Sequence, residues 1–160
     1  MAITVRKGRD GDFPAIMEMI NELAAFEKAA HAPTNSIGLM QHEKECFGFF
    51  VAEEDGRIIG SAIYFFAYYT WVGKSLYLDD IYVKPDFRGR GVGSMLLRSI
   101  FEVAKRENCK RLRWQVLDWN ENAISFYKKR GAAISGEWLN CDFDEKGIKQ
   151  FLERELPGYK

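Results

Sequence analysis

Leu76-Tyr77-Leu78-Asp79-Asp80-Ile81-Tyr82-Val83 is followed, after four residues, by Arg88-Gly89-Arg90-Gly91-Val92-Gly93. The first stretch is rich in large apolar and aromatic residues, which is typical of a buried central strand over residues 75–83. The second comes directly before apolar residues at helical spacing, which predict a helix over 91–107. A strand, a glycine-rich turn and a helix in succession place unpaired amides and partial positive charge at the helix start, where an anion binds well.

Three kinds of anion-binding loop compete for residues 88–94. A P-loop requires Lys-Ser or Lys-Thr after its glycines, and neither pair is present here. A dinucleotide-binding turn requires GxGxxG, whereas the glycines of this loop alternate. The spacing R-x-x-G-x-G is similar to the pyrophosphate loop of acetyl-CoA-binding N-acetyltransferases. We therefore predict a cofactor-binding loop, rather than a plain turn with two solvated arginines, made of Arg88, Gly89, Arg90, Gly91, Val92, Gly93 and Ser94.

The rest of the chain alternates strands and helices. Asp55-Gly56 predicts the turn of a β-hairpin, and Gly131 suits the left-handed position after a helix. The predicted strands are 3–6, 47–53, 57–66, 75–83, 112–116 and 137–143, and the predicted helices are 12–27, 36–45, 91–107, 120–130 and 146–153. Because no linker or repeat separates them, we expect one α/β domain over residues 1–160, with a mixed sheet covered on both faces.

The composition is that of an ordinary globular protein, with 47% hydrophobic and 29% charged residues. Lys plus Arg and Asp plus Glu both total 23, so the formal net charge of zero argues against a broad nucleic-acid or anionic-membrane surface. Cys46, Cys109 and Cys141 are far apart and odd in number, which supports neither a disulfide framework nor a zinc site. We expect no metal and, without an apolar signal or membrane-spanning run, a cytoplasmic protein.

The segment 76–83, together with the glycine loop, resembles the central motif of the GNAT superfamily of N-acetyltransferases. Three further stretches resemble the diamine acetyltransferase family, which includes enzymes acting on spermidine, spermine and thialysine: Tyr69-Thr70-Trp71-Val72-Gly73-Lys74, Trp119-Asn120 and Phe126-Tyr127-Lys128-Lys129-Arg130-Gly131-Ala132. The resemblance implies a single-domain α/β GNAT fold with a mixed, mostly antiparallel central sheet and helices on both faces. It also implies acetyl-CoA as cosubstrate and direct attack by the amine in a ternary complex.

Acetyl transfer to an amine poses three problems. A protonated amine, whose reference pKa is about 10.4, cannot attack; the thioester oxygen becomes negative; and the leaving thiolate benefits from a proton. The resemblance makes Tyr127 the general acid for the thiolate, whereas the residues alone favour a tyrosine that packs a helix. It also implies a bulge near Ile81, Tyr82 and Val83 whose amides meet the acetyl oxygen and the pantetheine arm.

Acidic residues are the candidates for handling the acceptor amine. Asp79 and Asp80 are strand neighbours, so alternation places them on opposite faces and lets at most one enter the acceptor site. The resemblance favours Asp79, which would bind the cationic amine and take its proton through water, although the relatives usually carry the longer Glu there. Glu27 matches a substrate-binding acidic position of the family, and a solvated helix-end carboxylate is the equal alternative.

The resemblance assigns four further residues. Asn120 and Lys129 would contact the cofactor, and Asn120 is also a natural helix N-cap. Trp71 and Glu137 would contact the acceptor.

The acceptor itself stays open. Tyr69-Thr70 stands where the polyamine enzyme carries an acidic residue before its tryptophan, which brings the sequence closer to the thialysine type. Two other functions compete: a non-catalytic acyl-CoA-binding regulatory module, and an enzyme that acetylates peptides or proteins. The resemblance also implies a homodimer formed through C-terminal strands, with Trp138 and Phe143 as a candidate interface patch.

Overall fold

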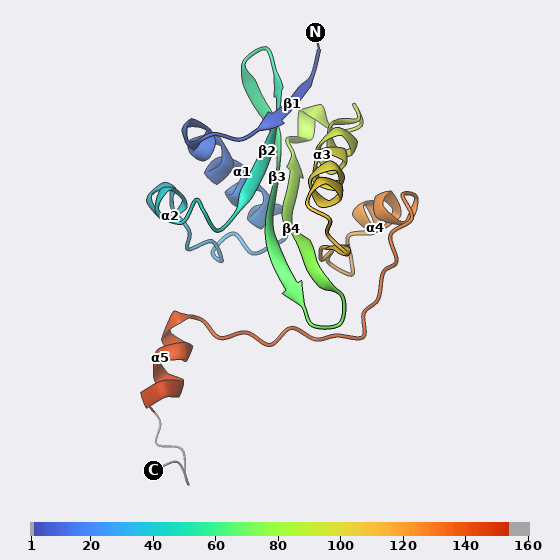
Figure 1. Ribbon diagram of the computed structural model, residues 1–160. Coiled ribbons are helices and arrows are strands. Elements are labelled where there is room, and N and C mark those ends of the chain that lie inside the picture. The colour runs from blue at the N-terminus through green and yellow to red at the C-terminus, as the bar shows by residue number, and fades with distance from the viewer. Residues whose placement is uncertain (1, 154–160) are drawn as a thin grey trace. The chain divides into compact units, whose positions relative to one another are not determined.

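The computed structural model describes residues 2–153. Close contacts group the chain into two compact units, which divide between Gln115 and Val116. The first unit holds the whole sheet with α1, α2 and α3, and the second holds α4 and α5 (Figure 1). No helix within residues 2–153 is both long and apolar enough to cross a membrane.

The first unit is built around a five-stranded sheet with the order β1-β2-β3-β4-β5. The first four strands are antiparallel and β5 is parallel to β4, so the predicted mixed, mostly antiparallel sheet is confirmed. The elements, among which η1 and η2 are short 3-10 helices, follow in this order: β1 (Thr4–Lys7), η1 (Asp10–Asp12), α1 (Phe13–Phe26), α2 (Ile37–His42), β2 (Gly48–Glu54), β3 (Arg57–Tyr69), β4 (Gly73–Val83), η2 (Pro85–Phe87), α3 (Val92–Arg106) and β5 (Arg111–Arg113).

Helices cover both faces of this sheet, as predicted (Figure 1). On one side, here called the α1 face, Ile63 and Tyr82 share a buried core with α1 and α2. On the other side, the α3 face, a Cβ atom added at Gly60 would lie 3.2 Å from the Leu96 side chain of α3. Each face is thus closed by an amphipathic helix whose apolar stripe meets the sheet.

β5 accompanies β4 only at its beginning. Ser75, Leu76 and Tyr77 are the β4 residues that have partners on β5. Beyond them, residues 78–83 of β4 have no ladder partner on that side within the described chain. One edge of β4 is therefore open directly before the glycine loop, and its amides and carbonyls are not used by the sheet.

The second unit contains α4 (Glu121–Lys128) and α5 (Glu145–Glu153). Asn120 caps α4 by accepting a hydrogen bond from the Ala123 amide at 3.2 Å, and Gly131 follows in the left-handed conformation with φ 87°. The predicted helix over 146–153 is confirmed, but the predicted strand over 137–143 is wrong. Those residues are extended without a strand partner, and a strand requires a neighbour that accepts and donates its backbone hydrogen bonds.

Candidate active site

The glycine loop leaves the first amides of α3 accessible to a ligand. Gly89 and Gly91 have φ values of 75° and 84°, a left-handed conformation that favours glycine. A Cβ atom added at Gly91, the N-cap of α3, would meet no heavy atom within 4 Å. Backbone conformation rather than crowding therefore requires glycine here, and the space beside the loop is open. Gly93 lies inside the first turn of α3.

The two arginines of the loop have different surroundings. Arg90 forms a two-pronged ion pair with Glu54. The Nε atom of Arg88 donates to the Val83 carbonyl at 2.9 Å, and its guanidinium lies 5.5 Å from the Phe26 ring centroid and 5.4 Å from that of Tyr82. The Arg88 side chain thus turns away from the start of α3 and towards the α1 face.

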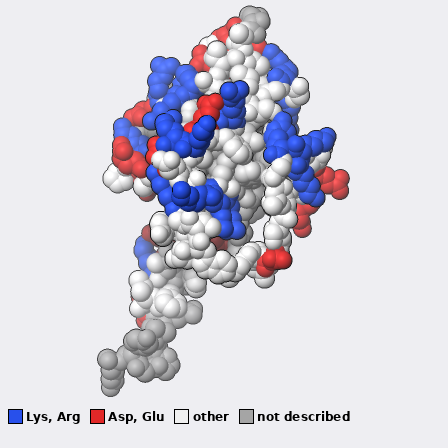
Figure 2. Space-filling view, turned by 45° about the vertical axis from the view of Figure 1, so that its right-hand side comes forward, with Lys and Arg blue, Asp and Glu red and all other residues white. Residues whose placement is uncertain are grey.

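Basic side chains are prominent in the view of Figure 2. Blue Lys and Arg side chains cover more of that view than red Asp and Glu side chains, although basic and acidic residues are equal in number over the whole chain. Such a local excess of cations favours an anionic ligand without requiring a basic protein. Within residues 2–153, no group of three or more His, Cys, Asp or Glu side chains is arranged to hold a metal ion.

The open edge of β4 presents the amides of Ile81 and Val83. The Lys84 amide donates to the Ile59 carbonyl at 2.9 Å, so Lys84 turns its backbone towards β3. Along an antiparallel strand, the N–H and C=O groups of successive residues point to alternate sides. The N–H and C=O groups of Val83 and Ile81 therefore point to the open edge, and those of Tyr82 point towards β3. Of the three backbone ligands predicted here, two therefore lie on the open edge, and Tyr82 contributes its side chain to the α1 face instead.

A β-bulge lies at Asp79. Tyr64 pairs with Leu78, and the preceding Ile63 pairs with Asp80, so Asp79 has no partner residue on β3. Cross-strand partners share a face, and adjacent residues of one strand point to opposite faces. Since Ile63 belongs to the α1 core, Asp80 points to the α1 face and Leu78 to the α3 face.

The bulge brings both aspartates to one face. Asp79 follows Leu78 and therefore turns to the α1 face, where burial and the charge of Asp79 raise the pKa of Tyr77. The prediction that Asp79 and Asp80 occupy opposite faces is wrong, because alternation breaks where an extra residue enters the strand. The bulge also lies slightly earlier than the predicted segment 81–83.

Glu27 completes an acidic cluster with Asp79 and Asp80. It follows α1 as its C-cap residue, and partial removal from water raises the pKa of Glu27 and of Asp79, although Asp79 keeps an exposed surface. Burial, together with the charges of Asp79 and Glu27, raises the pKa of Asp80 to about 6. Because the charges of Asp79 and Glu27 both act on Asp80, the three carboxylates lie in one region of the α1 face. Asp80 is the functional candidate that the sequence prediction set aside, although the adjacent carboxylate pair was visible.

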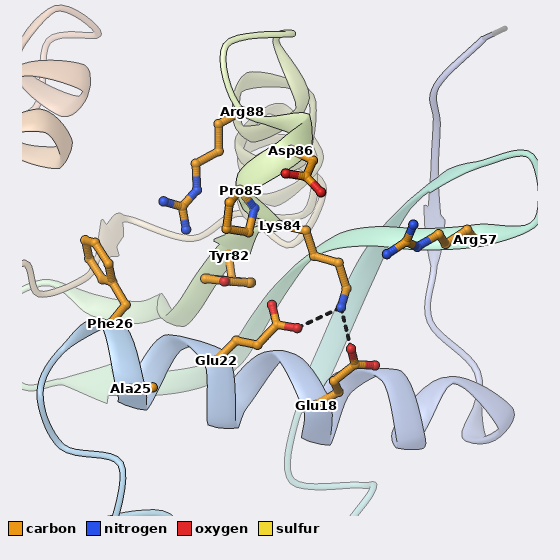
Figure 3. A pocket seen from close by; sticks show the side chains of 10 residues that line it. All are labelled: Glu18, Glu22, Ala25, Phe26, Arg57, Tyr82, Lys84, Pro85, Asp86 and Arg88. Carbon is orange, nitrogen blue, oxygen red and sulfur yellow. Dashed lines mark hydrogen bonds and ion pairs between the residues drawn. The ribbon is translucent and has the colours of Figure 1, made fainter.

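A cavity of about 520 Å³ lies on the same face, between α1 and the end of β4 (Figure 3). Its lining residues are Glu18, Glu22, Ala25, Phe26, Arg57, Tyr82, Lys84, Pro85, Asp86 and Arg88. The buried ammonium of Lys84 donates to Glu18 at 2.6 Å and to Glu22 at 2.8 Å. This network joins β4 to α1 across the cavity, and the hydrogen bond from Lys84 lowers the pKa of Glu22.

Four predicted site residues belong to the second unit. Tyr127 is 7% exposed, and burial raises the pKa of its phenol, which keeps the hydroxyl protonated at neutral pH. Asn120 and Lys129 are the two cap residues of α4. Glu137 lies exposed in the extended stretch before α5.

Trp71 belongs to the first unit and lies in the turn between β3 and β4, with 85% of its surface exposed. A strand rises about 3.3 Å per residue, so this turn lies roughly 20 Å from Asp79 along β4. Within one chain, the structure therefore does not bring Trp71 to the acidic cluster.

Three relatives share long stretches of this sequence. A mouse protein named thialysine N-epsilon-acetyltransferase is 35% identical over 165 aligned positions, which cover 94% of this chain and 97% of the relative. A Caenorhabditis elegans protein of the same name is 38% identical over 86% of this chain and 89% of its own. A human protein named spermidine/spermine N(1)-acetyltransferase-like protein 1 is 32% identical over 80% of this chain and 20% of its own.

Solved structures have the same fold. An integron cassette protein of V. cholerae superposes with a TM-score of 0.76 at 21% identity and covers 96% of this chain and 99% of its own. A Clostridium acetobutylicum protein described as a predicted acetyltransferase, solved with acetyl-CoA, superposes with a TM-score of 0.70 at 20% identity, covering 88% of this chain and 96% of its own. The sequence model of the acetyltransferase (GNAT) family matches residues 14–132, and the chain belongs to that family.

Proposed function

We propose that this acetyltransferase moves the acetyl group of acetyl-CoA to a primary amine of a small cationic acceptor, of the lysine-like amino acid or diamine type. The observation that carries the proposal is the acidic cluster on the α1 face, next to the open edge of β4. Three carboxylates in one site attract an ammonium group and provide a base for its proton. Relatives named for thialysine and for spermidine or spermine support an acceptor of this chemistry.

The donor half of the site is backbone. The free amides at the start of α3 would bind the pyrophosphate of the cofactor, because a helix N-terminus presents donors and partial positive charge together. The amides of Ile81 and Val83 on the open edge would bind the pantetheine arm and the acetyl oxygen. Fixed amides of this kind stabilise the negative oxygen of the tetrahedral intermediate without having to reorganise.

The acceptor half is made of side chains. Glu27 and Asp79 would hold the ammonium, and Asp80 would take its proton, directly or through one water. A carboxyl group with a pKa of about 6 is a better base near neutral pH than an ordinary aspartate. The neutral nitrogen would form a bond to the acetyl carbon and release its second proton to solvent, while the carbon–sulfur bond breaks and the Tyr127 hydroxyl donates its proton to the leaving thiolate. Solvent then restores the phenol.

The homodimer also belongs to this proposal. The extended stretch before α5 exposes Trp138, Leu139 and Phe143, which are 75%, 89% and 68% exposed. Apolar side chains exposed together mark an interaction surface in soluble proteins. Sedimentation velocity should show a dimer at micromolar concentration, and a single monomer species would remove this part of the proposal.

A thiol-release assay with acetyl-CoA tests the proposed reaction. The panel is thialysine, lysine, putrescine and spermidine, with a lysine-containing peptide as the competing substrate class. We expect rapid release with at least one free amine and little with the peptide. Release with the peptide alone would identify a protein acetyltransferase instead. Binding of CoA by calorimetry without release on any amine would identify a regulatory module.

A further inference from the structure

The Arg88 side chain is held in place by several contacts in the cavity on the α1 face. Its Nε atom is fixed on the Val83 carbonyl, and its guanidinium lies between the aromatic rings of Phe26 and Tyr82 (Figure 3). An arginine held between two rings keeps its planar fork in one orientation. In the proposed function the backbone of the glycine loop binds the anionic part of the cofactor, so this guanidinium is available for a different group.

The charges around Arg88 indicate that the group it binds is an anion. The two glutamates of α1 that line the cavity, Glu18 and Glu22, are engaged by the buried ammonium of Lys84. The Arg88 side chain is exposed to solvent beyond its Nε bond. A guanidinium fork matches a carboxylate through two parallel hydrogen bonds, whereas it repels a second ammonium.

Residues that line the cavity are close neighbours in sequence of the residues in the acidic cluster. Tyr82 lies two residues after Asp80 on the same face of β4, and Phe26 directly precedes Glu27 at the end of α1. Two residues of a strand span about 6.6 Å, which is close to the length of an extended lysine side chain. An acceptor whose amine reaches Asp80 can therefore place a group at its far end over Tyr82, beside Arg88.

We propose that Arg88 determines acceptor specificity by binding the carboxylate of an amino acid whose distal amine is acetylated at the acidic cluster. The acceptor class is then a lysine-like amino acid rather than a diamine. This inference rests on the proposed function and adds to it the chemistry of the acceptor's far end. It gives the Arg88 side chain a role distinct from the cofactor role predicted for the loop.

The test compares lysine with 1,5-diaminopentane, which is lysine without its carboxylate. For the wild type we expect kcat/KM to be at least about tenfold higher for lysine. In Arg88→Met the ratio of the two kcat/KM values should fall by about tenfold, mainly through the KM for lysine, as expected when a charged hydrogen-bonding partner is lost. Arg57→Met is the matched control, because Arg57 lines the same cavity, and its ratio should stay at the wild-type value.

Three outcomes would overturn the inference while leaving the proposed function intact. The first is a wild type that uses both acceptors equally, and the second is a ratio of kcat/KM values that is unchanged in Arg88→Met. The third is an equal loss of kcat/KM for both acceptors in Arg88→Met, together with a higher KM for acetyl-CoA, which would make Arg88 a cofactor ligand. A wild type that acetylates no amine would instead overturn the proposed function. Arg88→Lys, which keeps the charge, should recover part of the ratio and guards against loss of folding in Arg88→Met; a thermal melt of each variant completes the control.

Discussion

The proposed donor and acceptor sides of β4 are built in different ways. On the open edge and at the start of α3, the groups available to the cofactor are backbone amides, released by a glycine at φ 84° and by the early end of β5. On the α1 face, the groups available to the acceptor are the side chains Glu27, Asp79 and Asp80. The bulge at Asp79 lies between the two sides along β4 and turns a second carboxylate to the acceptor side.

Because of this difference, cofactor binding should tolerate most substitutions, whereas acceptor specificity should change with single substitutions. A backbone anion site depends on chain conformation, and almost any substitution outside the glycines preserves it. A side-chain site changes its specificity with one substitution, because each carboxylate contributes its own charge. A family that retains the cofactor can therefore diversify its acceptors, and variants of the two sides should fail in distinguishable kinetic parameters.

The largest effect should come from Tyr127, the side chain predicted to protonate the leaving thiolate. Tyr127→Phe removes the hydroxyl that would protonate the thiolate and keeps the buried ring. We expect kcat to fall by about 10²–10⁴-fold, the usual contribution of general acid catalysis, with little change in the KM for acetyl-CoA. Steady-state thiol release measures this. Unchanged turnover of the best amine would show that the donor side is backbone alone.

Asp80→Asn should lower kcat by about 10²-fold at pH 7.5, because it removes the proposed base and keeps the shape of the side chain. The acid limb of the wild-type pH profile should lie near the pKa of about 6 and disappear in the variant. Below that pH the wild-type carboxyl is protonated and accepts no proton, so activity falls as pH falls. Equal activity of variant and wild type across the profile would exclude Asp80 as the base.

The backbone geometry of the proposed donor side was predictable from the sequence, and the arrangement of the proposed acceptor side only in part. Alternating glycines between a buried strand and an apolar helix specify local geometry, and Gly89 and Gly91 adopt the left-handed conformation that this pattern requires. Helix starts, hairpin turns and α4 with its Asn120 cap follow from equally local signals. Such signals involve neighbouring residues and need no knowledge of the partner strand.

The placement of Asp80 was not predictable in this way. Its face is set by the register between β3 and β4, which depends on how Ile63 and Tyr64 pack on opposite sides of the sheet. A single extra residue reverses the side-chain direction that alternation predicts. The strand predicted over 137–143 failed for a related reason, since apolar residues alone provide no hydrogen-bonding neighbour.

Gly91→Ala tests the backbone side directly. A side chain at a left-handed position costs about 1–2 kcal/mol, so we expect the free energy of unfolding to fall by that amount, or the loop to change conformation. In either case the KM for acetyl-CoA should rise by roughly tenfold while the KM for the amine changes little. Gly11→Ala is the control, because a Cβ atom there meets nothing within 4 Å and no left-handed φ is involved. Equal effects of the two substitutions on the cofactor KM would contradict a backbone donor site.

The smallest effect should be a shift of the pH profile in Asp79→Asn. Burial is the main cause of the raised pKa of Asp80, and the charge of Asp79 contributes more than that of Glu27. Removing the Asp79 charge should therefore lower the pKa of Asp80 and move the acid limb of kcat/KM to lower pH by a fraction of a unit. Since Asp80 acts as a carboxylate, the variant should keep a larger share of its plateau activity at pH 5.5.

Glu27→Gln should move the acid limb in the same direction by less. Asp86→Asn is the control and should not move it, because the charge of Asp86 is not among those that raise the pKa of Asp80. If the acid limb of the pH profile stays in place in both Asp79→Asn and Glu27→Gln, the three carboxylates do not act as one site. The acceptor side would then not be a coupled set of side chains, and its contrast with the backbone donor side would no longer hold.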